Sequence, residues 1–284
     1  MTINPIAESS LRLSTRPDGI AVLTVDQPGS RANVLTRALW DELHAVLLTL
    51  NQSTACVGLI LDSAKPNIFI AGADLKFLGS VPAPHDPAVR ELMEFGLATL
   101  ALLENLPFPT CAIIDGAALG GGLEVALACD YRLIGTNPKV ELGLPEVKLG
   151  LIPGWGGTQR LPRIIGVAPA VDLMVTGTSL TGIEAIQLGL ADGMVNQTTA
   201  EVLFASGEHS AKRTNKRYPL PHAEPNFLID EAQPALAALR PVIARGTELP
   251  LDGGLALETA AFVGLAGSDD SRSRIAEFFA SRKK

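Results

Sequence analysis

A triple glycine at residues 120–122 stands between two apolar runs, and this arrangement can support chemistry. The run before it, 111–114, is typical of a strand, and the run after it, 123–129, is typical of a helix. The first N–H groups of a helix have no partner within the helix and can bind negative charge. We therefore expect a site for an anion, or for a developing negative charge, at this helix start.

Two carboxylates lie near the triple glycine in the sequence. Glu124 is on the first turns of the expected helix, and Glu146 follows Pro145. A carboxyl group in apolar surroundings has a raised pKa and can pass protons near neutral pH, and amides at a helix start can stabilise an oxyanion. Together these groups suit proton transfer next to a carbonyl whose enolate must be stabilised. Two plainer interpretations stay open, namely that Glu124 is an exposed helix residue and Glu146 a turn carboxylate.

Other sites that depend on glycine or on metal-binding side chains do not match the sequence. The triple glycine does not fit G-x-G-x-x-G, and no G-x-x-x-x-G-K-[ST] occurs, so a dinucleotide or P-loop site is not expected. No G-x-S-x-G marks a serine-hydrolase elbow. The four histidines and three cysteines have no ligand spacing, so we expect no metal site.

Composition sets the broad class of the protein. The chain has 284 residues, of which 47% are hydrophobic and 19% charged, which indicates one large globular domain or two ordinary ones. A net charge of -7 argues against nucleic acid as the main partner. No apolar run reaches about 18 residues, so no membrane span is expected. The start of the sequence does not resemble a secretory signal, and Cys56, Cys111 and Cys129 read as reduced thiols, which favours the cytoplasm.

The elements that must position these groups begin with a strand–helix–strand pattern. Residues 20–25 and 57–61 are expected strands, and Thr36 is expected to cap the helix between them. A connection of this length implies a parallel sheet. A third apolar run, 68–70, ends in the small residues 71–74, which allow a ligand to approach the backbone. An ordinary turn after a strand is the plainer interpretation of that segment.

Later segments are expected to be mainly helical. Asp86 should cap a helix that starts at Pro87, and a capping box at 181–184 opens another helix. The composition turns polar after about residue 197, where we expect a linker or domain edge. We therefore divide the chain into a core, 1–196, and a linker with a C-terminal helical region, 197–284. The three helices expected in that region span 234–246, 253–267 and 271–282.

These motifs resemble those of the crotonase (enoyl-CoA hydratase/isomerase) superfamily. Their order and spacing over about residues 15–196 are specific, whereas the C-terminal helices match only in general character. The matching segments are Ile70–Lys76, Gly116–Glu124, Gly143–Gly154, Gly156–Pro162 and Leu188–Asp192.

The resemblance implies an α/β fold, a crotonase-like spiral of β-β-α units with a C-terminal helical region used in oligomer assembly. It implies a homotrimer or a dimer of trimers. The implied ligand is an acyl-CoA thioester, so that coenzyme A enters as part of the substrate and no separate cofactor is expected. Nucleic acid and membrane partners are not expected.

The resemblance also implies roles for individual residues. The oxyanion hole would be the backbone N–H groups of Ala73 and Gly121, and the catalytic carboxylates would be Glu124 and Glu146. The backbone around Ala73 would also meet the adenine end of coenzyme A. The residues expected there are Ala71, Gly72, Asp74 and Leu75.

Basic residues are weaker candidates for contacts with the coenzyme A phosphates. They are Arg31 and the terminal Lys283 or Lys284, and for the tail plain solvation is the favoured interpretation.

The presence of both glutamates favours hydration of a trans-2-enoyl-CoA in fatty-acid β-oxidation. A delta-3-delta-2-enoyl-CoA isomerase, which needs mainly Glu146, and a non-catalytic acyl-CoA binder are the alternatives. Segments 33–35, 130–133 and 139–146 look most like the hydratase module of multifunctional fatty-acid oxidation alpha subunits. Those proteins continue into an NAD-binding dehydrogenase that this sequence does not include, so we expect either a free-standing relative or a part of a longer protein.

Overall fold

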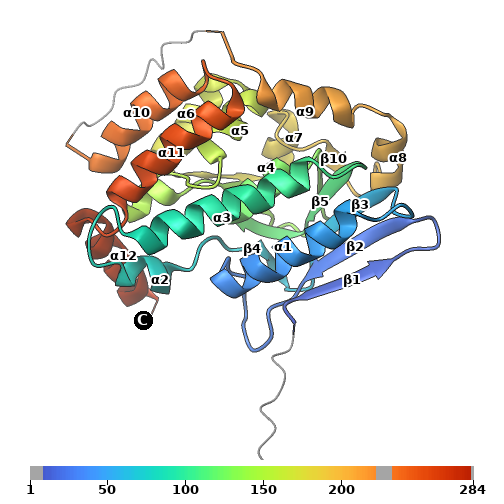
Figure 1. Ribbon diagram of the computed structural model, residues 1–284, viewed down its shortest axis with the longest axis horizontal. Helices are drawn as coiled ribbons and strands as arrows, with labels where there is room; N and C mark the ends of the chain where they lie inside the picture. Colours follow the sequence, from blue (N-terminus) through green and yellow to red (C-terminus); the bar gives the residue numbers. More distant parts are fainter. Residues whose placement is uncertain (1–8, 222–231, 283–284) are drawn as a thin grey trace, which may run out of the picture.

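The computed structural model describes residues 9–221 and 232–282, in which two β-sheets are covered by helices (Figure 1). The strands are β1 (Leu11–Thr15), β2 (Ile20–Val25), β3 (Gly58–Ser63), β4 (Asn67–Ile70), β5 (Thr110–Ile114), β6 (Gly116–Leu119), β7 (Tyr131–Ile134), β8 (Glu141–Gly143), β9 (Ser179–Thr181) and β10 (Gly193–Met194). The helices are α1 (Arg37–Asn51), α2 (Leu75–Ser80), α3 (Pro87–Glu104), α4 (Gly121–Ala128), the 3-10 helix η1 (Glu146–Leu149), α5 (Gly157–Ile165), α6 (Val167–Thr176), α7 (Gly182–Gln187), α8 (Ala200–Ala205), α9 (His209–Arg217), α10 (Pro234–Gly246), α11 (Leu251–Leu265) and α12 (Asp269–Ser281).

Successive strands of the chain enter two different sheets. The six-stranded sheet has the order β1-β2-β3-β5-β7-β10, and the four-stranded sheet has the order β4-β6-β8-β9. From β3 to β8 the first strand of each pair joins the larger sheet, the second joins the smaller one, and a helix follows. The fold is therefore the α/β spiral of β-β-α units that the resemblance implies.

Parallel pairing brings the carboxyl ends of equivalent strands to one edge of each sheet. Strands β2, β3, β5, β7 and β10 are parallel, and only β1 joins the larger sheet antiparallel. In the smaller sheet β6 lies between β4 and β8, parallel to both. Ile70 pairs with Ala118, so the chain leaves β4 and β6 side by side.

The predicted helix starts are confirmed. The Thr36 hydroxyl accepts a hydrogen bond from the Leu39 N–H at 3.2 Å, and the Asp86 carboxylate accepts one from the Ala88 N–H at 2.8 Å. Each cap fixes the first turn of a helix whose apolar face enters the core. Figure 1 shows α3 crossing the molecule between α1 and α11, both of which it contacts.

The C-terminal helices pack on the core. The predicted spans differ from α10, α11 and α12 by at most a few residues. Helix α11 contacts α3 and α5, and α12 contacts α2 and η1 (Figure 1). Part of the stretch expected to be a linker instead forms α8 and α9, which pack on the core through contacts with β7, α5 and α11. Residues 222–231 of that stretch lie outside the described residues. Over the described ranges, no helix has the length and hydropathy that crossing a bilayer would require.

Candidate active site

The two segments expected to supply oxyanion N–H groups follow neighbouring parallel strands. Residues 71–73 leave the end of β4, and the triple glycine leaves the end of β6. The two segments touch because a Cβ on Gly122 would lie 2.0 Å from the Ile70 carbonyl oxygen, a distance that only glycine allows. The absent side chain thus lets the start of α4 approach the end of β4.

The direction of the Ala73 N–H follows from its pairing with Leu35. The Leu35 N–H donates to the Gly72 carbonyl at 2.9 Å, and Leu35 forms an isolated parallel bridge with Ala73. In this kind of parallel pair the residue opposite the donor turns its own N–H away from the pairing strand. The Ala73 N–H therefore faces the side of β4 on which β6 lies.

The Gly121 N–H opens helix α4. The first two amides bonded within this helix are those of Leu123 and Glu124, which both donate to the Gly120 carbonyl, at 2.9 and 3.1 Å. The Gly121 N–H precedes that ladder and belongs to the set of N–H groups that a helix start leaves for other partners. Gly120 turns the chain into the helix with a φ of 53°, which glycine adopts without strain.

Glu124 is buried, with 1% of its surface exposed, so the interpretation as an exposed helix residue is wrong. Its Oε1 accepts hydrogen bonds from the Trp155 and Gly157 N–H groups, both at 2.7 Å. Burial raises the pKa of Glu124 to about 7, although these two hydrogen bonds act in the opposite direction. Because both bonds end on Oε1, Oε2 is the oxygen that can hold or transfer a proton.

Glu146 begins the 3-10 helix η1, and its carboxyl group is buried beside Glu124. Its Oε1 lies next to Gly120, where an added Cβ would come within 2.7 Å of it, and its buried Oε2 has no hydrogen-bond partner among the described residues. Burial, and after it the nearby Glu124 charge, hold the pKa of Glu146 well above its usual value. The structure therefore brings the two glutamates together at the triple glycine.

A third buried carboxylate, Glu258, completes this region and was not predicted. It lies on α11 with 0% of its surface exposed. Its Oε1 accepts from the Gly156 N–H at 2.6 Å, and its Oε2 accepts from the Thr158 N–H at 2.9 Å and from the Thr158 hydroxyl at 2.5 Å. Burial, followed by the Glu124 charge, raises the pKa of Glu258 to about 8.

Trp155 forms a wall beside these groups. Its ring lies against Gly121 on one side and against Gly96 of α3 on the other, where added Cβ atoms would come within 2.7 and 2.2 Å of ring atoms. It also meets Trp40 edge-on, with ring centroids 5.0 Å apart. The sequence could have suggested this position, since a large aromatic residue within a run of glycines must fill the space that they leave.

The site thus holds two carboxyl groups with raised pKa values. They lie near backbone N–H groups that follow the ends of the adjacent strands β4 and β6. The family described as Enoyl-CoA hydratase/isomerase matches residues 15–219. The chain belongs to this family.

Relatives within and around the family cover nearly the whole chain. The fatty acid oxidation complex subunit alpha of Shewanella halifaxensis is 37% identical over 294 residues, covering 96% of this chain and 41% of its own. The same subunit of Vibrio vulnificus is also 37% identical, with the same coverage of 96% and 41%. The chain thus spans less than half the length of these curated relatives.

Solved structures agree with the fold. An enoyl-CoA hydratase from Bacillus anthracis is 29% identical, covers 97% of this chain and 96% of its own, and has a TM-score of 0.62. An enoyl-CoA hydratase from Bacillus halodurans has a TM-score of 0.70 at 24% identity, over 95% of this chain and 100% of its own, and is evidence for the fold alone.

The residues expected to meet coenzyme A connect the carboxyl end of β4 to α2. The Ala71 N–H is already used, donating to the Asn33 carbonyl at 2.8 Å. The Asp74 carboxylate caps α2, which begins at Leu75, by accepting from the Lys76 N–H at 2.9 Å.

The loop with Arg31 is fastened next to β4. Buried Asn33 on this loop donates from Nδ2 to the Phe69 carbonyl at 3.0 Å and to the Ser63 hydroxyl at 2.9 Å. Arg31 itself is exposed two residues earlier in the chain. Lys283 and Lys284 lie outside the described residues.

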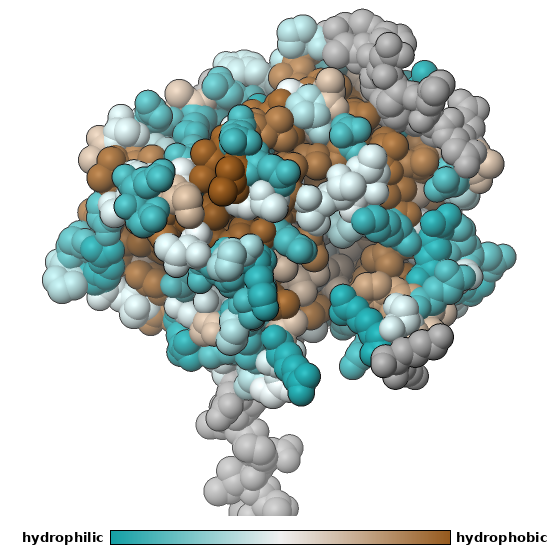
Figure 2. All heavy atoms as spheres, turned by 180° about the vertical axis from the view of Figure 1, so that it is seen from behind, coloured by the Kyte–Doolittle hydropathy of each residue, from teal (hydrophilic) through white to brown (hydrophobic). Residues whose placement is uncertain are grey.

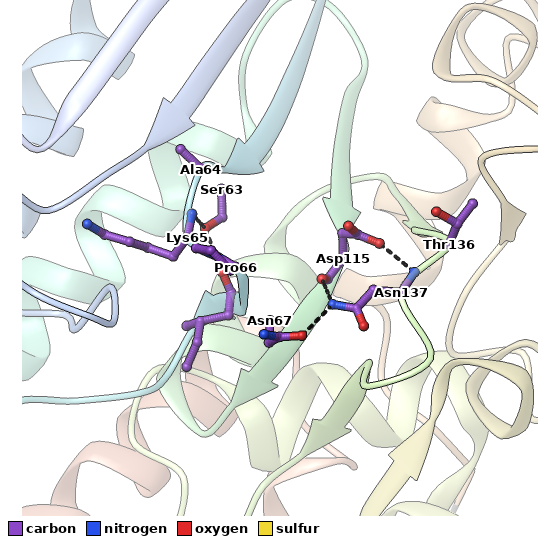
Figure 3. A pocket seen from close by; sticks show the side chains of 9 residues that line it. Ser63, Ala64, Lys65, Pro66, Asn67, Asp115, Thr136 and Asn137 are labelled. Carbon is purple, nitrogen blue, oxygen red and sulfur yellow. Dashed lines mark hydrogen bonds between the residues drawn. The ribbon is translucent and has the colours of Figure 1, made fainter.

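A polar pocket of about 470 Å³ lies away from the glutamates, where β3, β5 and β7 end and β4 and β6 begin (Figure 3). Its polar groups bond to one another. Asn137 donates from Nδ2 to the Asn67 side chain at 3.0 Å and to the Asp115 carbonyl at 2.9 Å. The pocket therefore opens at the amino ends of β4 and β6, whereas the glutamates lie near their carboxyl ends.

Proposed function

We propose that this protein is an enoyl-CoA hydratase, which adds water across the 2,3 double bond of a trans-2-enoyl-CoA. The observation that carries the proposal is the pair of carboxyl groups of buried Glu124 and half-buried Glu146 beside the N–H groups of Ala73 and Gly121. The names of the relatives, fatty acid oxidation subunits and enoyl-CoA hydratases, support a place in fatty-acid β-oxidation.

The two backbone N–H groups stabilise the charge that forms during addition. Water attacks C3, the electron pair of the double bond moves toward C2 and the carbonyl, and the thioester oxygen becomes enolate-like. Donors held in place by β4 and α4 need no reorganisation to bind that oxygen, and loss of one such donor costs about 3 kcal/mol of barrier. The same backbone at 71–75, with Arg31, is proposed to bind coenzyme A.

The carboxyl groups divide the proton transfers. Glu124 accepts two backbone N–H bonds, which favour its charged form, so it is the base that takes a proton from the attacking water. Glu146 has a buried oxygen without a partner among the described residues and a pKa held well above its usual value, so it is the acid that gives its proton to C2. The product gains one hydroxyl at C3 and one hydrogen at C2, and the pair exchanges its proton with water before the next turnover.

The test is a spectrophotometric hydration assay over enoyl-CoA substrates of increasing chain length. Glu124→Gln and Glu146→Gln should each lower kcat by about 10² to 10⁴-fold, since each removes one proton transfer. Glu94→Gln, an exposed glutamate on α3, is the matched control and should keep full activity.

Other outcomes distinguish the alternatives. Full activity in both glutamate variants would refute the assignment. Turnover of a 3-enoyl-CoA that depends on Glu146 and only mildly on Glu124 would indicate an isomerase instead. Tight acyl-CoA binding without turnover of any enoyl-CoA would indicate a binding protein.

We propose a homotrimer or a dimer of trimers for the assembly. Figure 2 shows apolar side chains exposed on the face opposite to that of Figure 1. Among the exposed large apolar residues are Ile183 of α7 and Val202 of α8, at 63% and 61% exposure. A solution mass of a single chain by light scattering would contradict this assembly.

The free thiols Cys56, Cys111 and Cys129 support the proposal of a cytoplasmic location.

A further inference from the structure

Four consecutive backbone N–H groups, at residues 155–158, are shared alternately between two buried carboxylates. The first and third donate to Glu124, both at 2.7 Å. The second and fourth donate to Glu258, at 2.6 and 2.9 Å. This segment joins the glycine-rich loop to α5, so one short stretch of backbone connects a glutamate of α4 to a glutamate of α11.

The Glu258 carboxyl group accepts three hydrogen bonds from residues 156–158. Both of its oxygens accept hydrogen bonds, and the Thr158 hydroxyl adds a third at 2.5 Å. The Gly156 N–H and Glu258 are 102 residues apart in the sequence, so this contact fixes the C-terminal helices against the loop. A buried carboxylate is costly unless it is fully hydrogen-bonded, and here the loop supplies those bonds.

The alternation links the positions of the two carboxylates. Each residue has only two soft dihedrals, so in a short segment that is bonded at both ends a rotation of one peptide group displaces its neighbours. If the second and fourth N–H groups lose their acceptor, the first and third shift as well. Those two are the groups that hold Oε1 of Glu124.

The carbonyl side of the segment is held separately. The Trp155 carbonyl accepts a hydrogen bond from Nη1 of Arg160 at 2.7 Å, and Arg160 is paired with Glu104 of α3. Loss of Glu258 therefore leaves the segment bonded to Arg160 and to Glu124 itself, without its attachment to α11.

We propose that Glu258 is a positioning residue, which holds residues 155–158 from α11 so that Glu124 keeps Oε2 directed at the substrate. This inference rests on the proposed hydratase function, because it gives Glu124 its role. Glu258 acts through the segment and does not itself exchange a proton with the substrate.

Where it is ionised, above about pH 8, Glu258 also contributes charge to the site. The groups that face it are Glu124 from α4, Glu146 from η1 and Arg160 from α5, in addition to Thr158. Its charge raises the pKa of Glu146, after the larger effects of burial and of Glu124. Removing that charge should move the pH profile of kcat toward lower pH, a change that a loss of packing alone does not produce.

The first experiment measures kcat and KM of Glu258→Gln and Glu258→Ala with a good enoyl-CoA substrate. Gln keeps the shape and one acceptor oxygen, so we expect a smaller loss than for Ala. For Glu258→Ala kcat should fall about 10 to 100-fold, since a displacement of about 1 Å can cost 10²-fold, while KM changes little. Val263→Ala, on the same helix, removes only buried methyl groups and should lose thermal stability while keeping kcat.

The second experiment does not depend on turnover. Hydrogen exchange of peptides that cover residues 154–159, followed by mass spectrometry, should be at least about 10-fold faster in Glu258→Gln than in the wild type. Unchanged exchange would overturn the inference, and so would a kcat in both Glu258 variants that matches Val263→Ala. If the wild-type protein hydrates no enoyl-CoA, the proposed function fails, and exchange still decides whether Glu258 holds the segment.

Discussion

The carboxyl groups of Glu124 and Glu146 lie close together but differ in surroundings. Two N–H donors converge on one oxygen of Glu124, whereas an oxygen of Glu146 has no partner among the described residues. When two neighbouring carboxyl groups have different environments, their pKa values differ, and one can act as the general acid while the other acts as the general base. The proton count of the pair, and not that of either residue alone, is what a pH profile would report.

The raised pKa values predict how stability depends on pH. In the folded protein the pKa is about 7 for Glu124 and about 8 for Glu258, against a usual 4.5. Between about pH 4.5 and 8 the folded state therefore holds protons that the unfolded state has released. The stabilisation is complete below pH 4.5 and is lost as pH rises through 7 to 8, at no more than about 1.4 kcal/mol per pH unit and group.

Urea unfolding at a series of pH values measures this effect. The free energy of unfolding should fall from pH 5 to pH 8, and Glu124→Gln should flatten the fall because it removes one of the titrating groups. Glu94→Gln, whose carboxylate is exposed, should keep the wild-type slope. An unchanged slope in Glu124→Gln would mean that this carboxyl is ionised in the folded state throughout.

The sequence pointed to those site residues that have a distinctive motif next to them in the chain. Glu124 and Glu146 stand beside glycines and prolines that mark a site, and the structure brings them together. Glu258 stands in an ordinary helical pattern, and its partners are about one hundred residues away. No local signal separates such a residue from a glutamate on a helix surface.

At the scale of elements, the junction of β4, β6 and α4 decides whether both N–H donors can face one point. Strand pairing places the two strand ends together, and the missing side chain of Gly122 lets α4 begin against the end of β4. The distance between the donors is therefore set by backbone contacts, which tolerate little adjustment.

Gly122→Ala should displace α4 from the end of β4. The added methyl would lie 2.0 Å from the Ile70 carbonyl oxygen, so the backbone must shift. We expect kcat to fall about 100-fold, because donors and carboxylates move relative to each other. Gly264→Ala, in a helix where the nearest atom to the new methyl is 3.5 Å away, should leave activity intact and raise stability by up to about 1 kcal/mol. Equal activity in the two variants would exclude this account.

Elements with strong local signals were predicted, and those defined by pairing were missed. The caps at Thr36 and Asp86 and the capping box at 181–184 are present. Strand β6 was not predicted, since Gly116–Leu119 consists of Gly, Ala and Leu, and it is a strand because β4 and β8 pair with it. The polar stretch after residue 197 was expected to be a linker, yet α8 and α9 form there by packing on the core.

Across the whole molecule, a buried group of charges joins distant helices. Glu104 at the end of α3 receives two hydrogen bonds from Arg160 of α5, at 2.8 and 2.9 Å, and lies 3.8 Å from the Lys216 ammonium group of α9. Burial is the largest single effect on Glu104 and would raise its pKa. The charge and hydrogen bonds of Arg160, together with the charges of Lys216 and Arg217, outweigh burial and lower the pKa. The carboxylate is therefore the common partner of two buried cations.

Glu104→Ala should destabilise the fold strongly. It leaves Arg160 and Lys216 buried without their acid, and breaking a buried pair costs about 3 to 5 kcal/mol. Chemical denaturation measures the loss, which should appear as a lower midpoint in urea. Glu94→Ala, which removes an exposed partner of Arg90, should change stability by less than about 1 kcal/mol. If both variants lost a similarly small free energy of unfolding, the buried group of charges would contribute little to stability.

The tie between Glu258 and residues 155–158 has a consequence for biosynthesis. A ribosome delivers the chain from its first residue, so both glutamates of the pair leave the exit tunnel long before α11 does. Until then residues 155–158 lack the hydrogen bonds to Glu258. A nascent chain, or one cut by a protease before α11, would carry the proposed reacting groups without the contact that aligns them. Translation would thus have to pass α11 before the proposed site could work at its full rate.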